Sequence, residues 1–486
     1  MNSLIGRWHI NLALVWSVLS TAMPLGFAQS TARDPGVRPV IDWSRIGGWP
    51  SDACPSVILR SIPGLMASEE KLFCAGAQEF AKEDKVKDDG LGPTMNLTSC
   101  FGCHQYPLSG GTSPLGKNPQ YDFGNSYPPG TNEVPPFVLP SGPVRVARFK
   151  QHLDVPGHPD DGGVHSLFTI TGLEGADGCV LAQEDFQKEI DRKNIIYRIP
   201  TPTFGAGLIE QIDDKTIVDN VNYQAGRVFG GNNTVRISRG RLNLVQPFHT
   251  NGSENRNGND GTIARFGWKA QNKSLLIFAG EAYNVEIGIS NEVFPTEREE
   301  KRECQFHTVP NDTSHPENLF DPDPKVRLDA LSDVEKFAAF MRFLAPPEPS
   351  TDTPGGAVSI ALGADTFDKI GCSACHTPEL HTSPISTVAA LRNKPVRLYS
   401  DLALHKMGQL ADGISQGVAG KDEFRSAPLW GLGQRVFFLH DGRTTDLVEA
   451  IEAHDSNGSD AQPAIGLYKA LSTKEKQDLL NFLRSL

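Results

Sequence analysis

The pentapeptide Cys-x-x-Cys-His occurs twice in this chain of 486 residues, at positions 100–104 and 372–376. In a c-type haem site the two thiols bond the porphyrin and the histidine binds the iron, so five consecutive residues fix the cofactor. A zinc or thiol–disulfide protein would use the same cysteine pairs but would leave both histidines unexplained. The motifs therefore predict two covalently bound haem c groups, attached at Cys100, Cys103, Cys372 and Cys375, with His104 and His376 as iron ligands.

Residues 1–28 have the layout of a secretory signal. Arg7 supplies the positive end, residues 12–18 form a short apolar core, and Gly26 and Ala28 are the small residues of a cleavage site. The apolar run is too short and too often interrupted by polar residues for a retained anchor. The sequence thus predicts a periplasmic protein with no membrane span after signal removal.

Charge and cysteine content agree with that compartment. The net charge of −12 repels nucleic acid, so no nucleic-acid partner is expected. Outside the motifs the sequence allows three disulfide pairings, and we favour the one that closes the shortest loops. It joins Cys54 to Cys74 and Cys179 to Cys304.

Helical periodicity and turn residues indicate a mainly α fold with irregular loops and a small β insertion. Residues 107–143, rich in Pro and Gly, are predicted to be loop, and residues 144–170 include a short strand. Gly and Asn residues in 222–263 favour a β-hairpin or long loop. Apolar residues at helical spacing predict helices over 68–87, 332–344, 357–370 and 472–486.

The repeated order of helix and motif predicts two cytochrome c-like domains. A Pro- and Gly-rich linker at 348–356 separates them. The expected organisation is a signal peptide over 1–28, an N-terminal domain with a large insertion over 29–347, and a C-terminal domain over 348–486.

The second haem needs a sixth ligand, and the sequence offers several. Leu447, Ile451 and His454 share one face of a predicted helix, which would bury the histidine beside apolar side chains. Without a haem nearby, such a histidine is usually an ordinary core or surface residue. The other candidates downstream of the motif are His381, His405, Met407 and His440.

Several longer runs resemble the dihaem oxidoreductases, a family related to bacterial dihaem cytochrome c peroxidases. The similar runs extend from about residue 64 to the end and lie in the family's order. They are GAGLIE at 205–210, RFGWKA at 265–270, SDLALHKMG at 400–408, SAPLWGLG at 426–433, LHDGR at 439–443 and EAI at 449–451.

The resemblance implies two unequal haems. The position that supplies the distal ligand of the C-terminal haem, often Met in relatives, is His454 here, which implies ligation by His376 and His454 with Met407 as the alternative. Imidazole in place of thioether favours ferric iron, so a lower potential is expected. No histidine lies between His104 and His152, so the loop ligand of many relatives is absent and the first iron is expected to be open.

The same resemblance implies a distal glutamate and a nearby glutamine at the first haem. Glu210 and Gln211 are the predicted catalytic pair, and Glu281 and Glu286 are the alternatives. Trp268 and Trp430 are candidate electron relays, although core packing is the commoner role of tryptophan. A calcium ion often bridges the haem domains in relatives, but no dense acidic loop is present here, so calcium is left open.

Together these features predict reduction of hydrogen peroxide at the N-terminal haem, with electrons passed through the C-terminal haem. A small c-type cytochrome or another redox protein is the expected donor. Two alternatives remain open at this point. One is a dihaem electron-transfer cytochrome without peroxidase activity, and the other is a dihaem oxidase or oxygenase that acts on a different substrate.

Overall fold

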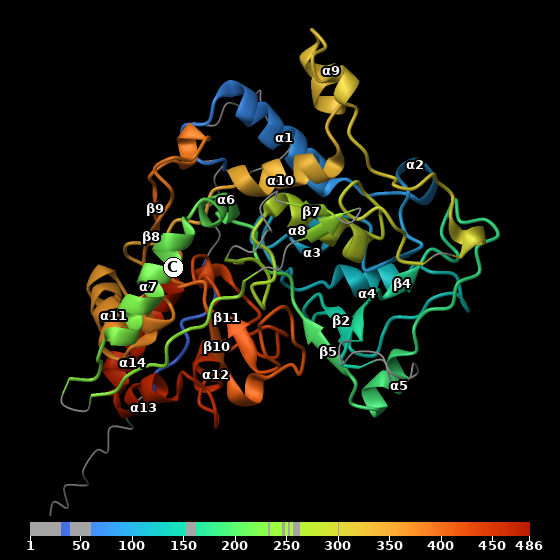
Figure 1. Cartoon of the computed structure of the whole chain (residues 1–486). Helices are drawn as coiled ribbons and strands as arrows, with labels where there is room; N and C mark the ends of the chain where they lie inside the picture. The colour runs from blue at the N-terminus through green and yellow to red at the C-terminus, as the bar shows by residue number, and fades with distance from the viewer. Residues whose placement is uncertain are drawn as a thin grey trace, which may run out of the picture. The chain divides into compact units, whose positions relative to one another are not determined.

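Two pairs of packed helices, one beside each Cys-x-x-Cys-His motif, organise the fold (Figure 1). The structure is a computed structural model. It describes residues 31–38, 60–151, 162–231, 234–244, 263–299 and 301–486, and the backbone of 248–250 and 253–255. Residues Ala32–Leu486 form one compact unit. The predicted signal peptide lies outside the described residues.

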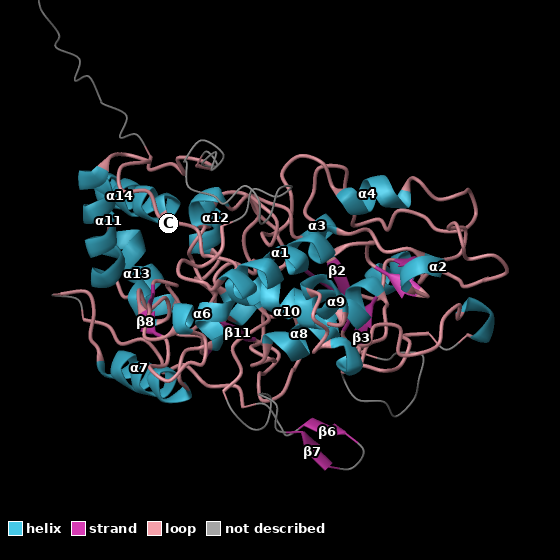
Figure 2. Ribbon diagram, turned by 90° about the horizontal axis from the view of Figure 1, so that it is seen from above, coloured by secondary structure: helices cyan, strands magenta, loops and turns pink. Residues whose placement is uncertain are grey.

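Short helices joined by long loops make up most of the chain, and Figure 2 shows how little of it is strand. The α-helices are α1 (Ala67–Ala81), α2 (Val86–Asp89), α3 (Cys100–Cys103), α4 (Pro119–Gly124), α5 (Phe186–Asp191), α6 (Ala206–Glu210), α7 (Asp214–Gly226), α8 (Leu275–Ala282), α9 (Pro324–Asp329), α10 (Asp333–Phe343), α11 (Ala357–Lys369), α12 (Leu447–Glu452), α13 (Gln462–Ala470) and α14 (Thr473–Ser485).

The strands form small antiparallel sheets rather than a layer of their own. In the largest, β2 (Val146–Phe149) lies between β3 (Gly163–His165) and β5 (Ile195–Arg198). The others are two-stranded. They pair β1 (Thr94–Met95) with β4 (Phe168–Thr169), β6 (Phe248–Thr250) with β7 (Ser253–Asn255), β8 (Leu380–His381) with β9 (Pro395–Val396), and β10 (Leu404–Lys406) with β11 (Glu423–Arg425).

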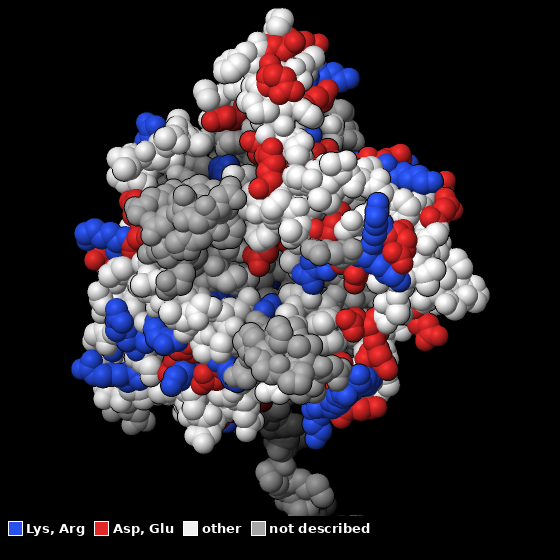
Figure 3. Space-filling view, turned by 45° about the vertical axis from the view of Figure 1, so that its right-hand side comes forward, with Lys and Arg blue, Asp and Glu red and all other residues white. Residues whose placement is uncertain are grey.

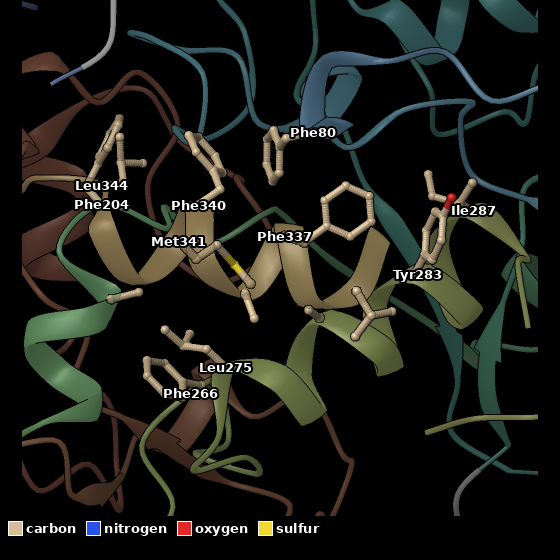
Figure 4. Packing of buried hydrophobic residues seen from close by; sticks show 14 of the residues in the cluster. Phe80, Phe204, Phe266, Leu275, Tyr283, Ile287, Phe337, Phe340, Met341 and Leu344 are labelled. Atoms are coloured by element: carbon tan, nitrogen blue, oxygen red, sulfur yellow. The ribbon is translucent and has the colours of Figure 1, made fainter. Parts of the chain in front are cut away.

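The first helix pair is α1 against α10, and a glycine sets how closely they cross. A Cβ on Gly76 would lie 2.2 Å from the Lys336 carbonyl oxygen and 2.9 Å from Cβ of Phe340. One turn further along α1, Phe80 packs on Phe340 with ring centroids 4.7 Å apart (Figure 4). The Phe80 ring also lies 6.0 Å from the ring of His104, so this pair supports the first motif.

The second pair, α11 against α14, repeats this arrangement. A Cβ on Gly363 would lie 2.0 Å from the Asp478 carbonyl oxygen and 2.6 Å from Cβ of Phe482. Phe367, one turn after the glycine, lies 5.4 Å from the Phe482 ring and 6.5 Å from that of His376. In both pairs, the helix before the motif therefore packs on its partner through a Gly-x-x-x-Phe segment.

Capping explains why the two partner helices start where they do. Ser332 accepts a hydrogen bond from the backbone N–H of Glu335, and the Glu335 carboxylate accepts one from the Ser332 N–H. Ser472 and Glu475 form the same reciprocal box at the start of α14. Each box satisfies two N–H groups that a helix start leaves unpaired, and both helices begin as predicted.

Comparison with the sequence predictions gives three confirmed helices and three corrections. The helices predicted over 332–344, 357–370 and 472–486 are present as α10, α11 and α14. The helix predicted over 68–87 ends at Ala81, because the backbone is extended at Lys82. Residues 107–143 include α4, and the start of 222–263 belongs to α7 before the hairpin of β6 and β7.

The disulfide between Cys179 and Cys304 confirms one predicted pairing and joins residues 125 apart in sequence. Cys74 is also disulfide-bonded, and its predicted partner, Cys54, lies outside the described residues. Helices long and apolar enough to cross a membrane are absent from the described ranges. On the face in Figure 3, acidic and basic side chains are interspersed rather than gathered in one patch of a single sign.

Candidate active site

Each motif lies in the wall of its own cavity. Cys100, Cys103 and His104 line the first cavity, and Cys372, Cys375 and His376 line the second. The first motif forms the single turn of α3, where the Ser99 hydroxyl accepts a hydrogen bond from the Gly102 N–H. The second motif begins with a 3-10 turn, Cys372–Ala374. Thiols and imidazole of each motif thus reach one shared space.

Three histidines hold their rings in the same way. The Nδ1 atoms of His104, His376 and His454 lie 2.9, 3.1 and 2.8 Å from the carbonyl oxygens of Gly111, Tyr399 and Ala450. A carbonyl oxygen can accept a hydrogen bond but cannot donate one. Nδ1 of each ring therefore carries the proton, and Nε2 keeps its lone pair free. This anchoring is typical of iron- and zinc-ligating histidines.

The second cavity brings His376 and His454 together. His454 follows the last turn of α12, and both imidazoles line this cavity. Burial lowers the pKa of His454, and burial together with the neighbouring His454 lowers the pKa of His376 to about 4. Both rings are therefore neutral near pH 7, the form that binds a metal.

The competing ligands in this half are placed less favourably. His405 uses both ring nitrogens, with Nε2 2.9 Å from the Asp401 carboxylate and Nδ1 3.5 Å from Sγ of Cys375. His440 lines the cavity, but its ring stacks on Phe424 at 4.5 Å. Met407 also lines the cavity and remains the alternative, whereas His381 is outside it, beside Glu379.

Two buried cations complete the second cavity. Arg425 and Arg435 line it, and burial lowers the pKa of each guanidinium to about 10. Arg425 donates to the Gly267 carbonyl, and neither guanidinium forms an ion pair with a carboxylate of the described residues. Buried charges usually have a partner, and the two propionates of a haem would supply one. The side chains present therefore fit the group that the motif predicts.

The first cavity has a different composition. Among the described residues that line it, His104 is the one histidine, and Met341 supplies a thioether. His165 contacts Glu184 and the Gly162 carbonyl. His152 and His158 lie outside the described residues.

Two carboxylic acids line the first cavity, Glu281 and Glu286. Glu286 belongs to a π-helical turn, Tyr283–Ile287, and accepts a hydrogen bond of 2.5 Å from the side-chain amide of Asn96. Burial raises the pKa of Glu286 to about 6 and raises that of Glu281, which accepts a hydrogen bond from Asn272. A buried carboxyl that titrates near neutral pH suits general acid–base work.

The predicted pair Glu210 and Gln211 is not among the described residues that line this cavity. Glu210, at the end of α6, accepts hydrogen bonds from Arg342 Nε at 2.7 Å and from the Leu275 N–H at 2.9 Å. The Gln211 carbonyl accepts one from the Ser383 N–H. Glu281 and Glu286 were the sequence alternatives, but the π-helical turn that directs Glu286 inward has no clear sequence signal.

One tryptophan lines both cavities. Trp268 contributes to the first and the second cavity, and its indole N–H donates to the Ile199 carbonyl at 3.0 Å. Trp430 lines neither of them. Beside Trp268, the buried Lys269 and Arg198 share the carboxylate of Asp412, at 3.0 and 2.6 Å. One anchored aromatic ring, next in sequence to a member of this charge cluster, therefore forms part of the wall of both cavities.

Three solved structures are similar to this chain at low sequence identity. A hydrazine synthase from Kuenenia stuttgartiensis is 19% identical over 33% of this chain and 55% of its own, with a TM-score of 0.22. The diheme peroxidase BthA from Burkholderia thailandensis is 14% identical over 46% and 66%, with a TM-score of 0.27. A MauG-like protein associated with microbial copper homeostasis is 18% identical over 58% and 89%, also with a TM-score of 0.27.

This chain thus spans about half to two thirds of the length of the first two structures. No curated protein matches the sequence. Residues 174–486 match the family model described as "Di-haem oxidoreductase, putative peroxidase". That match covers well over half of the chain and includes the second motif, so this protein belongs to the di-haem oxidoreductase family, enzymes that use two haem groups.

Proposed function

We propose that this protein is an exported c-type dihaem peroxidase that reduces hydrogen peroxide at the first cavity with electrons passed through the second. The supporting observation is the inequality of the two cavities. His376 and His454 together line the second, whereas the first offers one histidine and two carboxyls that face the same space. Two axial imidazoles suit electron transfer, and an open iron beside a carboxyl suits chemistry on peroxide.

The two halves of the chain would each hold one haem in a cytochrome c-like frame. Residues 29–347 contain the pair of α1 and α10, and residues 348–486 contain α11 and α14. The equivalent seating of Gly76 and Gly363 supports this division. Cys100, Cys103, Cys372 and Cys375 would form the thioethers, and Arg425 and Arg435 would pair with propionates of the second haem.

When bound, a haem supplies an iron that accepts and donates single electrons and, where one axial position is open, binds peroxide. Reduction of H₂O₂ to two waters consumes two electrons and two protons. Glu286 would take the proton from one peroxide oxygen and return it to the other. Asn96 fixes the orientation of its carboxylate, and Glu281 lies in the same cavity as a second proton carrier.

Electrons would reach the first cavity past Trp268, which lines both cavities and is anchored through its indole N–H. A small c-type cytochrome or another redox protein is the proposed donor. Export to an oxidising compartment agrees with the disulfide between Cys179 and Cys304. Hydrogen peroxide is the proposed small-molecule substrate.

A second candidate function rests on Met341. Its thioether lies in the wall of the first cavity and is the kind of ligand that closes the iron of many electron-transfer cytochromes. Figure 4 shows this side chain directed toward Leu275, on the side of α10 away from Phe80. If Met341 bound the first iron, the protein would be an electron-transfer cytochrome without peroxidase activity.

Ferric EPR and optical spectra of the holoprotein separate these two functions. We expect one high-spin and one low-spin haem, and turnover of peroxide with a reduced c-type cytochrome as donor. Met341→Leu should leave both signals unchanged. Two low-spin haems in the parent, with Met341→Leu turning one of them high-spin, would establish the electron-transfer function instead.

A further inference from the structure

A third cavity, separate from the two that contain the motifs, lies where the two halves of the chain meet. Its volume is about 630 Å³, within the range of cavities that bind small molecules. We call it the proline-walled cavity because five of its lining residues are proline. They are Pro63, Pro346, Pro347, Pro349 and Pro395.

Rigid backbone shapes this cavity. Residues next to the prolines join two distant segments of the N-terminal half, since the Ala345 N–H donates to the Arg60 carbonyl and the Ile62 N–H to that of Phe343. Proline loses little further conformational freedom when a ligand binds. The cavity is therefore largely preformed, which lowers the entropy cost of binding.

Two aromatic rings connect the proline-walled cavity to the second motif. Tyr399 lines the cavity, and its backbone carbonyl accepts the hydrogen bond from Nδ1 of His376. Its φ of +53° is unfavourable for an aromatic residue, and the surrounding contacts hold it there. The same residue thus orients the ring of the motif histidine His376 and forms part of the cavity wall.

Trp430 is the second ring, and it separates the proline-walled cavity from a smaller one. That smaller cavity is also lined by Trp268 and by Arg425 and Arg435, the cations of the second haem site. Gly205 seats the tryptophan, because a Cβ there would lie 2.6 Å from the indole ring. Trp430 is thus shared by the proline-walled cavity and the smaller cavity that contains Arg425 and Arg435.

The rim of the cavity is basic, although the whole chain carries a net charge of −12. Arg60, Lys394 and Arg397 line it together with the Glu348 carboxylate and Leu486. Glu348 pairs with Arg60, and Arg397 pairs with Glu379 at 3.0 Å. Lys394 is exposed and has no ion-pair partner among the described residues. An anion would be favoured at this rim.

We propose that the proline-walled cavity binds a small aromatic anion, a phenol that carries a carboxylate, and that this ligand donates electrons to the second haem site. The apolar wall and the rings of Tyr399 and Trp430 would contact the aromatic ring, and the basic rim would bind the carboxylate. Two phenol molecules would each lose one electron and one proton and become phenoxyl radicals. The two electrons and two protons reduce one H₂O₂ to two waters. The donor role rests on the proposed peroxidase function, whereas binding does not.

Calorimetry of the holoprotein with 4-hydroxybenzoate as the probe tests the binding. We expect one saturable site per chain and at least about tenfold weaker binding of neutral 4-hydroxybenzyl alcohol. Lys394→Gln should weaken binding of the probe about three- to fivefold, which is the effect of losing one exposed ion pair. Lys325→Gln, which removes an exposed lysine on α9 outside the cavity, is the control and should not weaken binding. Absent saturation, equal binding of the alcohol, or equal effects of both variants would overturn the proposal.

The donor role is tested by peroxide-dependent oxidation of the same probe, followed as loss of the phenol. Its half-saturation should match the calorimetric Kd and rise in Lys394→Gln in the same proportion. If the probe binds but is not oxidised while a reduced cytochrome still supports peroxide turnover, the donor role is wrong. If neither donor supports turnover, the peroxidase function fails and the binding result stands by itself.

Discussion

Glu286 is the residue on which the proposed peroxide chemistry depends most, and its burial makes a quantitative prediction. Burial raises its pKa from 4.5 to about 6. Acting as a base, it must be ionised before it takes a proton from peroxide. About nine tenths of the molecules carry the carboxylate at pH 7 and about one tenth at pH 5. The rate constant with peroxide should therefore fall about tenfold over that interval.

Replacement of the carboxyl should remove most of the rate. Glu286→Gln retains the shape and can still accept the hydrogen bond from Asn96, but it has no basic oxygen. A positioned base contributes about 10²- to 10⁴-fold, so the variant should react with peroxide slower by that factor and with no step near pH 6. Glu210→Gln is the matched control, because Glu210 pairs with Arg342 outside the cavity, and it should keep the parent's rate and pH profile.

Thermal stability will show whether a slower rate in Glu286→Gln comes from unfolding. Since the folded-state pKa of Glu286 is raised, the fold favours the protonated form and the carboxylate destabilises it. This cost is absent below pH 4.5 and complete above pH 6, where it amounts to about 2 kcal/mol. Glu286→Gln should thus have an equal or higher Tm than the parent at pH 8.

Stopped-flow absorbance of the Soret band, with peroxide in excess, gives the rate constants across pH 5 to 8. A profile that is flat between pH 5 and 7 in the parent would refute the assignment of the base. A rate for Glu286→Gln within about threefold of the parent would refute it as well, and Glu281→Gln would then be the variant to measure.

Three further predictions concern the second haem, the helix crossing and the disulfide. His454→Ala should convert the low-spin EPR signal of the second haem to high-spin, and an unchanged signal would point to another ligand. Gly76→Ala should destabilise by about 1–3 kcal/mol in urea, because its Cβ would lie 2.2 Å from the Lys336 oxygen. Gly466→Ala, in α13, is the control, because no neighbouring atom lies within 4 Å of the added Cβ, and it should stabilise the fold by about 0.5–1 kcal/mol. Equal destabilisation by both substitutions would contradict the packing argument. Cys304→Ser should lower the free energy of unfolding by about 2–5 kcal/mol, because it removes the disulfide to Cys179. A Tm equal to that of the parent would show that this disulfide does not stabilise the fold.

The features that were predictable from the sequence are local in the chain. A haem attachment motif holds both cysteines and the first iron ligand within five residues, so its chemistry follows from spacing alone. The starts of α10 and α14 follow from Ser-x-x-Glu, because both partners of the capping box lie in the first turn. His454 was found by resemblance, and its meeting with His376 in one cavity agrees with that prediction without testing ligation.

Contacts between distant segments decided the rest. Glu210 and Glu286 are both acidic residues near helix ends, and only the folded chain shows that Arg342 holds one while a π-helical turn directs the other into the cavity. Gly76 meets Lys336 across 260 positions of sequence. The same is true of Trp268 and of the proline-walled cavity, whose residues come from both halves of the chain. The sequence by itself predicted where each haem would be attached, and the tertiary structure decided what surrounds each motif, because burial and proximity arise only when remote segments pack together.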